Sequence, residues 1–263
     1  MKVSDKVIIV TGAGSGMGRE LTLQLAARGA KVAAVDMRET TLLETKSLAH
    51  GRVETFVLDI TDGKAVTDFP RTVETSLGPI DGLINNAGII QPFVPVNDLS
   101  LADATKVMNV NFYGPLSMIK AVLPGLLTRP EAHILNVSSM GAYAPVPGQS
   151  VYGASKAAIK LLTEGLRSEL LSTKVGVTIV FPGAINTNIA ANSGMKVPAT
   201  TADAPKIAMT EAADAARLMI EAIEKNKARL CIGRDAKMMD ILTRLNPVYA
   251  AKVIYKQMAI LLK

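Results

Sequence analysis

The stretch Lys6-Val-Ile-Ile-Val10, continued by Thr11-Gly-Ala-Gly-Ser-Gly-Met-Gly18, decides how this chain folds. Its first part is rich in β-branched residues and apolar at successive positions, which is typical of a strand buried on both faces. The glycines that follow permit a sharp turn, because glycine accepts backbone angles that other residues avoid. Residues 17–28 then carry apolar side chains at Leu21 and Leu25, as a helix does. A strand, a glycine-rich turn and a helix in this order predict the first unit of an α/β fold.

Six further apolar runs of strand length alternate with helix-like stretches along the rest of the chain. The expected strands cover residues 31–35, 55–58, 83–84, 133–137, 175–181 and 229–232, and the longer helix-like stretches cover 62–77, 100–127, 151–172 and 211–225. Strands rich in Val and Ile and separated by helices form parallel sheets covered on both faces, and their crossovers are right-handed. We therefore expect a single α/β domain over residues 1–233, with a doubly wound, seven-stranded, Rossmann-type parallel sheet.

The composition limits the class of protein. The chain has 263 residues, of which 49% are apolar and 20% charged, enough to bury a core and too apolar for a disordered chain. Its one cysteine, Cys231, excludes an internal disulfide and suits a reducing, cytoplasmic compartment. Because Cys231 lies in an expected strand, we interpret it as a buried packing residue and not a nucleophile. We expect neither a secretory signal nor a membrane-spanning helix.

The net charge of +6 is concentrated at one end of the chain. Residues 225–263 hold nine Lys or Arg and two Asp, a balance of +7, so the other 224 residues sum to −1. The basicity therefore belongs to the C-terminal part, and it does not indicate a nucleic-acid-binding domain.

The glycine-rich turn is typical of a dinucleotide site. It lets the backbone approach a pyrophosphate closely and directs the N-terminus of the following helix at the phosphates. The second expected strand ends at Asp36, whose carboxylate can accept hydrogen bonds from the adenosine ribose and would repel a 2′-phosphate. Ser15, and not a basic residue, precedes Gly16, although Arg38 is a nearby cation. These residues favour NAD as the cofactor over NADP.

Seven motifs resemble those of the classical short-chain dehydrogenase/reductase family, over residues 6 to about 187 and in part to 233. They are Thr11-Gly12-x-x-x-Gly16-x-Gly18, Asp59-Ile60, Asn85-Asn86-Ala87-Gly88, Asn111, Ser139, Tyr152-x-x-x-Lys156 and Pro182-Gly183-x-x-x-Thr187. The resemblance implies an NAD(P)-dependent enzyme that acts on CH–OH groups. It also implies a catalytic set made of Asn111, Ser139, Tyr152 and Lys156, in which Asn111 holds a water that relays protons to Lys156.

The implied roles agree with elementary chemistry. Tyr152 and Lys156 share a helix face because they are four residues apart. A phenol titrates near about 10, but the Lys156 ammonium and the positive nicotinamide favour the phenolate and should lower its pKa. Tyr152 can then exchange a proton with the substrate oxygen, which Ser139 stabilises. Ser138 competes for that role, but the 13-residue separation from Ser139 to Tyr152 matches the family.

The remaining implied contacts are to the cofactor. The full set of expected cofactor-binding residues is Gly12, Ser15, Gly16, Met17, Gly18, Asp36, Asp59, Ile60, Asn86, Ala87, Gly88, Tyr152, Lys156, Pro182, Gly183, Ile185 and Thr187. By resemblance, Asp59 and Ile60 contact the adenine, Lys156 the nicotinamide ribose, and Ile185 and Thr187 the carboxamide. We expect no metal site, since no residues have ligand spacing.

Two segments depart from the family's pattern or are poorly defined by it. Residues 186–205 follow a strand end and are the expected mobile lid. The chain then continues about thirty residues past Gly233, as a basic amphipathic extension over 234–263. Asn246-Pro247 predicts a helix start, and Lys252, Lys256 and Lys263 fall on one face of that helix. Such a helix can lie on an anionic membrane surface; the preferred alternative is that its apolar face covers a subunit interface or the substrate cleft.

The leading functional hypothesis is an oxidoreductase that transfers a hydride between NAD(H) and an apolar secondary alcohol or ketone. The family resemblance further implies a homodimer or homotetramer. One alternative is an NADPH-dependent 3-oxoacyl or carbonyl reductase. Another is a non-catalytic NAD-binding sensor or scaffold, although such a protein has no need for the complete set of Asn111, Ser139, Tyr152 and Lys156.

Overall fold

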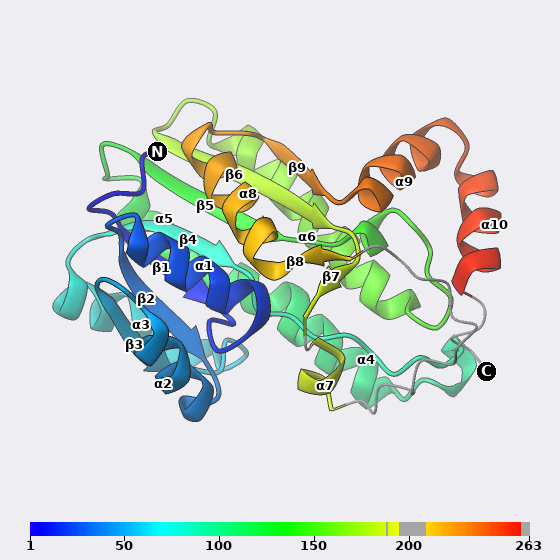
Figure 1. The fold of residues 1–263 in the computed structure, drawn as a ribbon, viewed down its shortest axis with the longest axis horizontal. Helices are drawn as coiled ribbons and strands as arrows, with labels where there is room; N and C mark the ends of the chain where they lie inside the picture. Colours follow the sequence, from blue (N-terminus) through cyan, green and yellow to red (C-terminus); the bar gives the residue numbers. More distant parts are fainter. Residues whose placement is uncertain (188, 195–208, 259–263) are drawn as a thin grey trace.

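The computed structural model describes residues 1–187, 189–194 and 209–258, and a seven-stranded parallel sheet runs through its centre (Figure 1). The strand order is β3-β2-β1-β4-β5-β6-β9, and every pairing is parallel. The strands are β1 (Val7–Thr11), β2 (Lys31–Asp36), β3 (Val53–Val57), β4 (Ile80–Asn85), β5 (Ala132–Val137), β6 (Val175–Pro182) and β9 (Arg229–Ile232). The expected Rossmann-type α/β sheet is thus confirmed.

Helices cover both faces of the sheet. They are α1 (Gly16–Ala27), α2 (Glu39–Leu48), α3 (Gly63–Leu77), α4 (Leu101–Met108), α5 (Gly114–Leu126), α6 (Ser150–Glu169) and α8 (Ala212–Glu224). Two further helices, α9 (Arg234–Leu245) and α10 (Pro247–Met258), follow the last strand. Alternate residues of β1 feed two separate cores: Ile8 packs with α1 and α8, and Ile9 packs with α3 and α5. This alternation explains why β1 has no polar face.

The stretch 100–127 differs from the single helical run that the sequence predicts. A π-helix, η2 (Asn109–Tyr113), separates α4 from α5. Such turns occur often at functional sites, and here the buried Asn111 side chain binds the backbone of Ile89. Two short strands, β7 (Ile185–Asn186) and β8 (Thr210–Glu211), also escaped prediction, since two residues carry no periodicity.

The carboxyl ends of the strands meet at one edge of the sheet, where parallel α/β folds bind their ligands. The chain moves from β1 to β2 and β3 on one side, and from β4 to β5 and β6 on the other. The resulting switch point lies between β1 and β4. The glycine-rich turn follows β1 there, and Asn86 follows β4.

The C-terminal residues form two helices that pack against each other, α9 and α10 (Figure 1). Asn246 caps α10 as expected, because its Oδ1 accepts a hydrogen bond from the Tyr249 amide at 2.9 Å. Ala250 and Ile254 are buried in a small core with Ala144 and Met239. The inward face of α10 therefore covers the segment that follows Ser139. The division of the chain at residue 233 stays a prediction.

Parts of two expected features lie outside the described residues. The expected lid is described at 186–187 and 189–194, which include the short helix α7 (Ile189–Asn192), and Lys263 is among residues 259–263, which are not described. Over the part of the chain that is described, none of the helices combines the length and apolar character needed to cross a bilayer. The cytoplasmic location stays a prediction.

His133 makes the fold sensitive to acid. It is buried in β5 with its Nε2 atom 2.8 Å from Thr178 Oγ1, and burial lowers its pKa to about 3. Between pH 3 and 6.5 the unfolded chain binds a proton that the folded chain does not, so stability falls as the pH drops through this window. Acidification from pH 7 to pH 4.5 should lower the unfolding free energy of the unsubstituted protein. In His133→Asn, which has no such proton to bind, this drop should be smaller by about 2–3 kcal/mol.

Urea unfolding at the two pH values measures this loss. His50→Asn, at an exposed histidine, is the control and should leave the loss unchanged. An equal loss in His133→Asn and the unsubstituted protein would contradict the assignment.

Candidate active site

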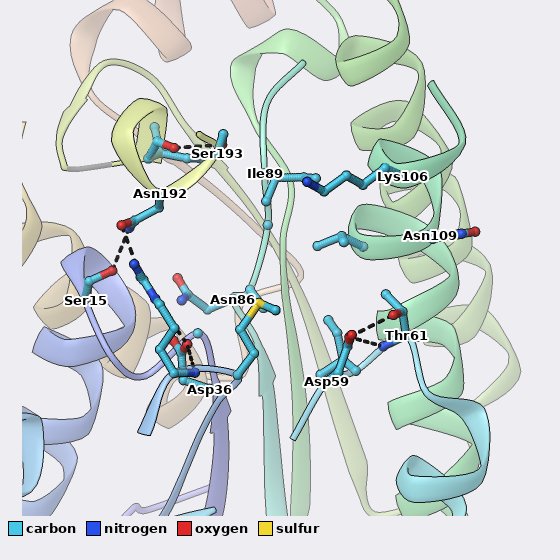
Figure 2. A pocket seen from close by; sticks show the side chains of 18 of the residues that line it. Ser15, Asp36, Asp59, Thr61, Asn86, Ile89, Lys106, Asn109, Asn192 and Ser193 are labelled. Carbon is cyan, nitrogen blue, oxygen red and sulfur yellow. Dashed lines mark hydrogen bonds and ion pairs between the residues drawn. The ribbon is translucent and has the colours of Figure 1, made fainter. Parts of the chain in front are cut away.

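A cavity of about 940 Å³ opens at the switch point of the sheet (Figure 2). This volume is within the range of small-molecule sites. Eleven of the expected cofactor-binding residues line it: Gly12, Ser15, Gly16, Met17, Asp36, Asp59, Ile60, Asn86, Ala87, Gly88 and Thr187. The other six, which do not line it, are Gly18, Tyr152, Lys156, Pro182, Gly183 and Ile185.

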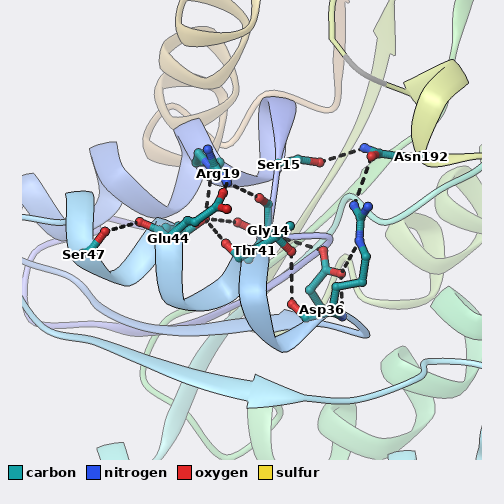
Figure 3. A network of polar contacts seen from close by, with 11 residues as sticks. Gly14, Ser15, Arg19, Asp36, Thr41, Glu44, Ser47 and Asn192 are labelled. Atoms are coloured by element: carbon teal, nitrogen blue, oxygen red, sulfur yellow. Dashed lines mark hydrogen bonds and ion pairs between the residues drawn. The ribbon is translucent and has the colours of Figure 1, made fainter.

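The glycine-rich turn exposes bare backbone to this cavity. Gly12 and Gly16 have φ angles of +69° and +52°, which other residues rarely adopt. Gly18 has a packing role, since a Cβ there would overlap the Gly12 carbonyl oxygen. The Arg19 guanidinium stabilises the turn by donating a hydrogen bond to the Gly14 carbonyl at 2.7 Å (Figure 3). A rigid turn without side chains at the start of α1 fits the pyrophosphate of a dinucleotide.

Asp36 ends β2 beside this turn and lines the cavity. Its carboxylate accepts hydrogen bonds from the backbone amides of Gly14 and Arg38, both at 3.1 Å. The Arg38 Nε atom is 4.0 Å from the same carboxylate. Asp36 is therefore held in place, and its side chain is 10% exposed. A fixed carboxylate at this edge fits the hydroxyls of an adenosine ribose.

Helix α7 is tied to the nucleotide end of the cavity by side-chain contacts (Figures 2 and 3). Asn192 accepts a hydrogen bond from the Arg38 guanidinium at 3.1 Å and donates one to Ser15 Oγ at 2.9 Å. Sequence reasoning singled out Ser15 and Arg38 but missed Asn192. No local signal could have found it, because 177 positions separate it from Ser15.

Lys156 and Asn111 meet beside the cavity, at Gly88. A Cβ on Gly88 would lie 3.1 Å from Lys156 Nζ and 3.2 Å from Asn111 Oδ1. These contacts are so short that any other residue at position 88 would displace the two side chains. Lys156 Nζ donates to the Val137 carbonyl at 3.1 Å, and burial lowers the pKa of this amine to about 8. The Asn111 amide group is engaged with Ile89 and, at 3.0 Å, with Ser155 Oγ. Its part in a water relay stays a prediction.

The two candidate serines have different surroundings. Ser138 is buried, and its hydroxyl donates to the Lys156 carbonyl at 2.7 Å, which anchors α6 to the end of β5. Ser139 Oγ accepts a hydrogen bond from the Gly141 amide at 3.0 Å and also reaches the Tyr152 phenol. The geometry therefore favours Ser139, and not Ser138, as the partner of a reacting oxygen.

The structure gives the pKa of Tyr152 for the chain alone, whereas the expected lowering of this pKa concerns the complex with the oxidised nicotinamide and stays a prediction. Burial raises the pKa of the phenol above its usual value, and the hydrogen bond to Ser139 lowers it only in part. Lys156 Nζ lies 6.0 Å from the centre of the Tyr152 ring, and this amine is itself desolvated. The chain alone therefore leaves Tyr152 protonated at neutral pH, since the effect of desolvation on its pKa outweighs that of the hydrogen bond to Ser139.

Sequence reasoning also missed two polar residues that support the site. Gln91 is fully buried; its side chain accepts from the Tyr152 amide at 2.8 Å and donates to the Gly148 carbonyl at 2.9 Å. It thereby caps α6, whose own N-cap residue makes no side-chain cap. Asp235 accepts from the Ala184 amide at 2.7 Å and holds the turn after β6. These contacts join distant segments, so the local sequence carries no signal for them.

The cap by Gln91 leads to a prediction about stability. Gln91→Met keeps the size of the side chain but leaves the Tyr152 amide without a partner, while the Gly148 carbonyl keeps only its bond from Gln149 Nε2. We expect this to cost about 1–3 kcal/mol of unfolding free energy. Urea unfolding measures this cost. Gln24→Met, which removes a solvent-exposed bond to the Ala213 carbonyl, is the matched control and should cost less than about 1 kcal/mol. Equal costs for the two variants would argue against the cap.

Comparison with known proteins identifies relatives along most of the chain. The model of the family described as short chain dehydrogenase matches residues 6–197. "Putative oxidoreductase SadH" of Mycobacterium tuberculosis is 34% identical over 256 residues, which cover 91% of this chain and 90% of that protein.

Solved structures agree with this match. A short-chain dehydrogenase/reductase from Burkholderia phymatum in complex with NAD has a TM-score of 0.83 at 26% identity, covering 94% of this chain and 98% of the other. A short-chain dehydrogenase from Burkholderia cenocepacia in complex with NADP has a TM-score of 0.81 at 28% identity, covering 97% of this chain and 99% of the other.

Within the described residues, no cluster of His, Cys, Asp or Glu side chains could hold a metal ion.

Proposed function

Because this chain belongs to the short-chain dehydrogenase family, we propose that it interconverts a secondary alcohol and its ketone with NAD(H) as the hydride carrier. Membership makes it an NAD(P)-dependent oxidoreductase. The observation that carries the proposal is the meeting of Ser139, Tyr152 and Lys156 beside a cavity with a glycine cradle. A nucleotide-binding scaffold would need the cradle but not a buried phenol next to a hydroxyl.

The chain's own residues handle the substrate oxygen and its proton. The bound nicotinamide supplies the site that accepts or gives the hydride. Ser139 donates a hydrogen bond to the substrate oxygen and stabilises the charge that develops there. In reduction, Tyr152 is already protonated and gives its proton to that oxygen. In oxidation it takes the proton, which requires the positive charges of Lys156 and the oxidised ring to offset the effect of burial on its pKa.

We assign NAD and not NADP as the preferred cofactor on the strength of Asp36. Its fixed carboxylate lines the cavity and would repel a 2′-phosphate. Arg38 argues for NADP, since its guanidinium lies near the same edge and could bind a 2′-phosphate. The ion pair and the bond to Asn192 engage this cation, which favours NAD.

An apolar substrate suits the segment after Ser139. Met140, Tyr143 and Val146 are partly buried apolar residues of that segment, and α9 and α10 pack against them. Turnover of a panel of secondary alcohols and ketones, followed by the absorbance of the reduced nicotinamide, tests the proposal with both nucleotides. Oxidation of apolar secondary alcohols with NAD⁺ supports it. Activity confined to NADPH and 3-oxoacyl compounds would favour the reductase alternative, and nucleotide binding without any turnover would favour a sensor or scaffold.

We also propose that the chain works as a homodimer or homotetramer. Tyr113 of η2 and Leu161 of α6 expose 54% and 69% of their surface, and these two elements contact each other. Leu101, at the start of α4, is 86% exposed. Exposed apolar side chains gathered on neighbouring helices are typical of subunit interfaces. Light scattering of the purified protein measures the subunit number.

A further inference from the structure

The outward faces of α9 and α10 carry large apolar side chains. Six of them expose more than half of their surface: Met238, Ile241, Leu245, Val248, Tyr249 and Tyr255. In α10 the exposed positions recur every three to four residues, opposite the buried Ala250 and Ile254. Each helix therefore has one face in the protein and a second face that leaves apolar groups in water. An exposed apolar surface of this kind marks an interaction site.

The exposed charged residues between these side chains are all basic. The exposed cations are Arg234, Lys237, Arg244, Lys252 and Lys256. The stretch 234–258 contains two acidic residues, and both are engaged with the protein. Asp235 accepts from the Ala184 amide, and Asp240 pairs with Arg229 and Arg244. The outward surface of the hairpin, which we call the α9–α10 face, thus combines apolar groups with positive charge.

We propose that the α9–α10 face docks on an anionic phospholipid surface. Apolar and aromatic side chains can enter the interface between headgroups and acyl chains, while lysines and arginines neutralise the headgroups. A second copy of this chain fits the face less well, because a two-fold contact would set Arg234, Lys237, Lys252 and Lys256 of one copy against the same cations of the other. This mode of attachment needs no membrane-spanning helix.

The α9–α10 face is the outward side of the two helices whose inward sides cover the segment after Ser139. Met239 and Ile254 pack on Ala144 with their inward sides, five residues from Ser139 in the sequence. Docking through this face brings the lipid bilayer, in which apolar compounds dissolve, close to the segment that begins at Ser139. The docking itself requires neither substrate nor nucleotide, so its test is independent of the enzymatic proposal.

Fluorescence gives a direct test, because the chain contains no tryptophan. Tyr249→Trp places a single reporter on the face, and Leu48→Trp places one at an exposed site at the end of α2 as the control. The vesicles contain phosphatidylcholine with about 30 mol% phosphatidylglycerol, which gives them the negative surface potential of an anionic leaflet. When these vesicles are added, the Tyr249→Trp emission should shift to the blue. The control should not shift, and neither reporter should respond to pure phosphatidylcholine. No shift at position 249, or equal shifts at both, would overturn the proposal.

Charge reversal tests the electrostatic part. Each cation near an anionic surface contributes roughly a five-fold gain in binding, so Lys252→Glu with Lys256→Glu should weaken co-sedimentation with the anionic vesicles at least about 25-fold. Lys46→Glu with Lys64→Glu, at two exposed lysines of α2 and α3, makes the same change in net charge and should retain binding. An equal loss in both double variants would overturn the proposal.

The subunit number of the double variant Ile241→Ser with Tyr249→Ser tests the alternative occupant. A change in this number would overturn the proposal, since a second copy of the chain would then occupy the face.

Discussion

Tyr152→Phe should lower kcat by about 10³-fold while the Kd for NAD⁺ changes less than about two-fold. The substitution removes only the hydroxyl that exchanges a proton with the substrate, and positioned general acids and bases contribute about 10²–10⁴-fold. The ring remains to pack against Gly141. Because Tyr152 lies outside the wall of the nucleotide cavity, the loss should fall on turnover and spare binding. Steady-state kinetics and nucleotide titration on the same preparation measure both quantities.

Tyr255→Phe is the matched control for this result. It removes an exposed phenol from α10 and should keep kcat within about two-fold, as surface substitutions usually do. Retention of activity in Tyr152→Phe would contradict the assigned proton transfer. A parallel loss of turnover and NAD⁺ binding would instead indicate that the ring, and not its hydroxyl, is what the site requires.

Asp36→Asn should shrink the preference for NAD⁺ over NADP⁺ by about 10²-fold in kcat/KM. The amide keeps the shape of the side chain, and its oxygen can still accept from the Gly14 amide. What disappears is the negative charge facing the 2′-phosphate, and close like charges across an interface cost several kcal/mol. Removal of the carboxylate also releases the Arg38 guanidinium from its ion pair, so that it can approach a phosphate.

Glu39→Gln tests whether this effect depends on position. Glu39 is exposed at the start of α2, and its substitution changes the net charge by the same amount without touching the cavity. The cofactor preference of Glu39→Gln should stay within about two-fold of the starting value. An unchanged preference in Asp36→Asn would mean that another group reads the 2′-position.

The parts of the molecule that sequence could predict are those whose cause is local. β1, the turn after it and α1 follow from residues adjacent in the chain, as does the cap of α10 by Asn246. Their expected boundaries agree with the structure to within a residue or two. The catalytic set was predicted for a different reason: its motifs resemble those of a known family at compatible spacing.

Features that depend on distant contacts could not be predicted. Gln91 caps α6 across 61 positions, and Asn192 reaches Ser15 across 177. The π-helix at Asn111 is another case, because its side chain binds the loop after β4 and a helical pattern alone does not reveal the extra residue. In each case the polar partner lies on another element, and only the assembled sheet brings the two together.

The protonation of Tyr152 shows how burial changes an argument made from spacing. A spacing of four positions from a tyrosine to a lysine predicts a shared helix face, and the structure has it. The spacing does not reveal that both groups are desolvated, which moves the pKa of the amine down to about 8 and that of the phenol up. A charge-based argument for an acidic phenol therefore applies to the nucleotide complex and not to the chain by itself.

The most direct test of the account is a crystal structure of the chain with NAD⁺ and a secondary alcohol that it oxidises. The account predicts an alcohol carbon about 3–3.5 Å from the reactive carbon of the nicotinamide, with its oxygen about 2.6–3.2 Å from both Tyr152 Oη and Ser139 Oγ. A nicotinamide ring bound away from these two hydroxyls would contradict the catalytic account and leave only the fold and the nucleotide site.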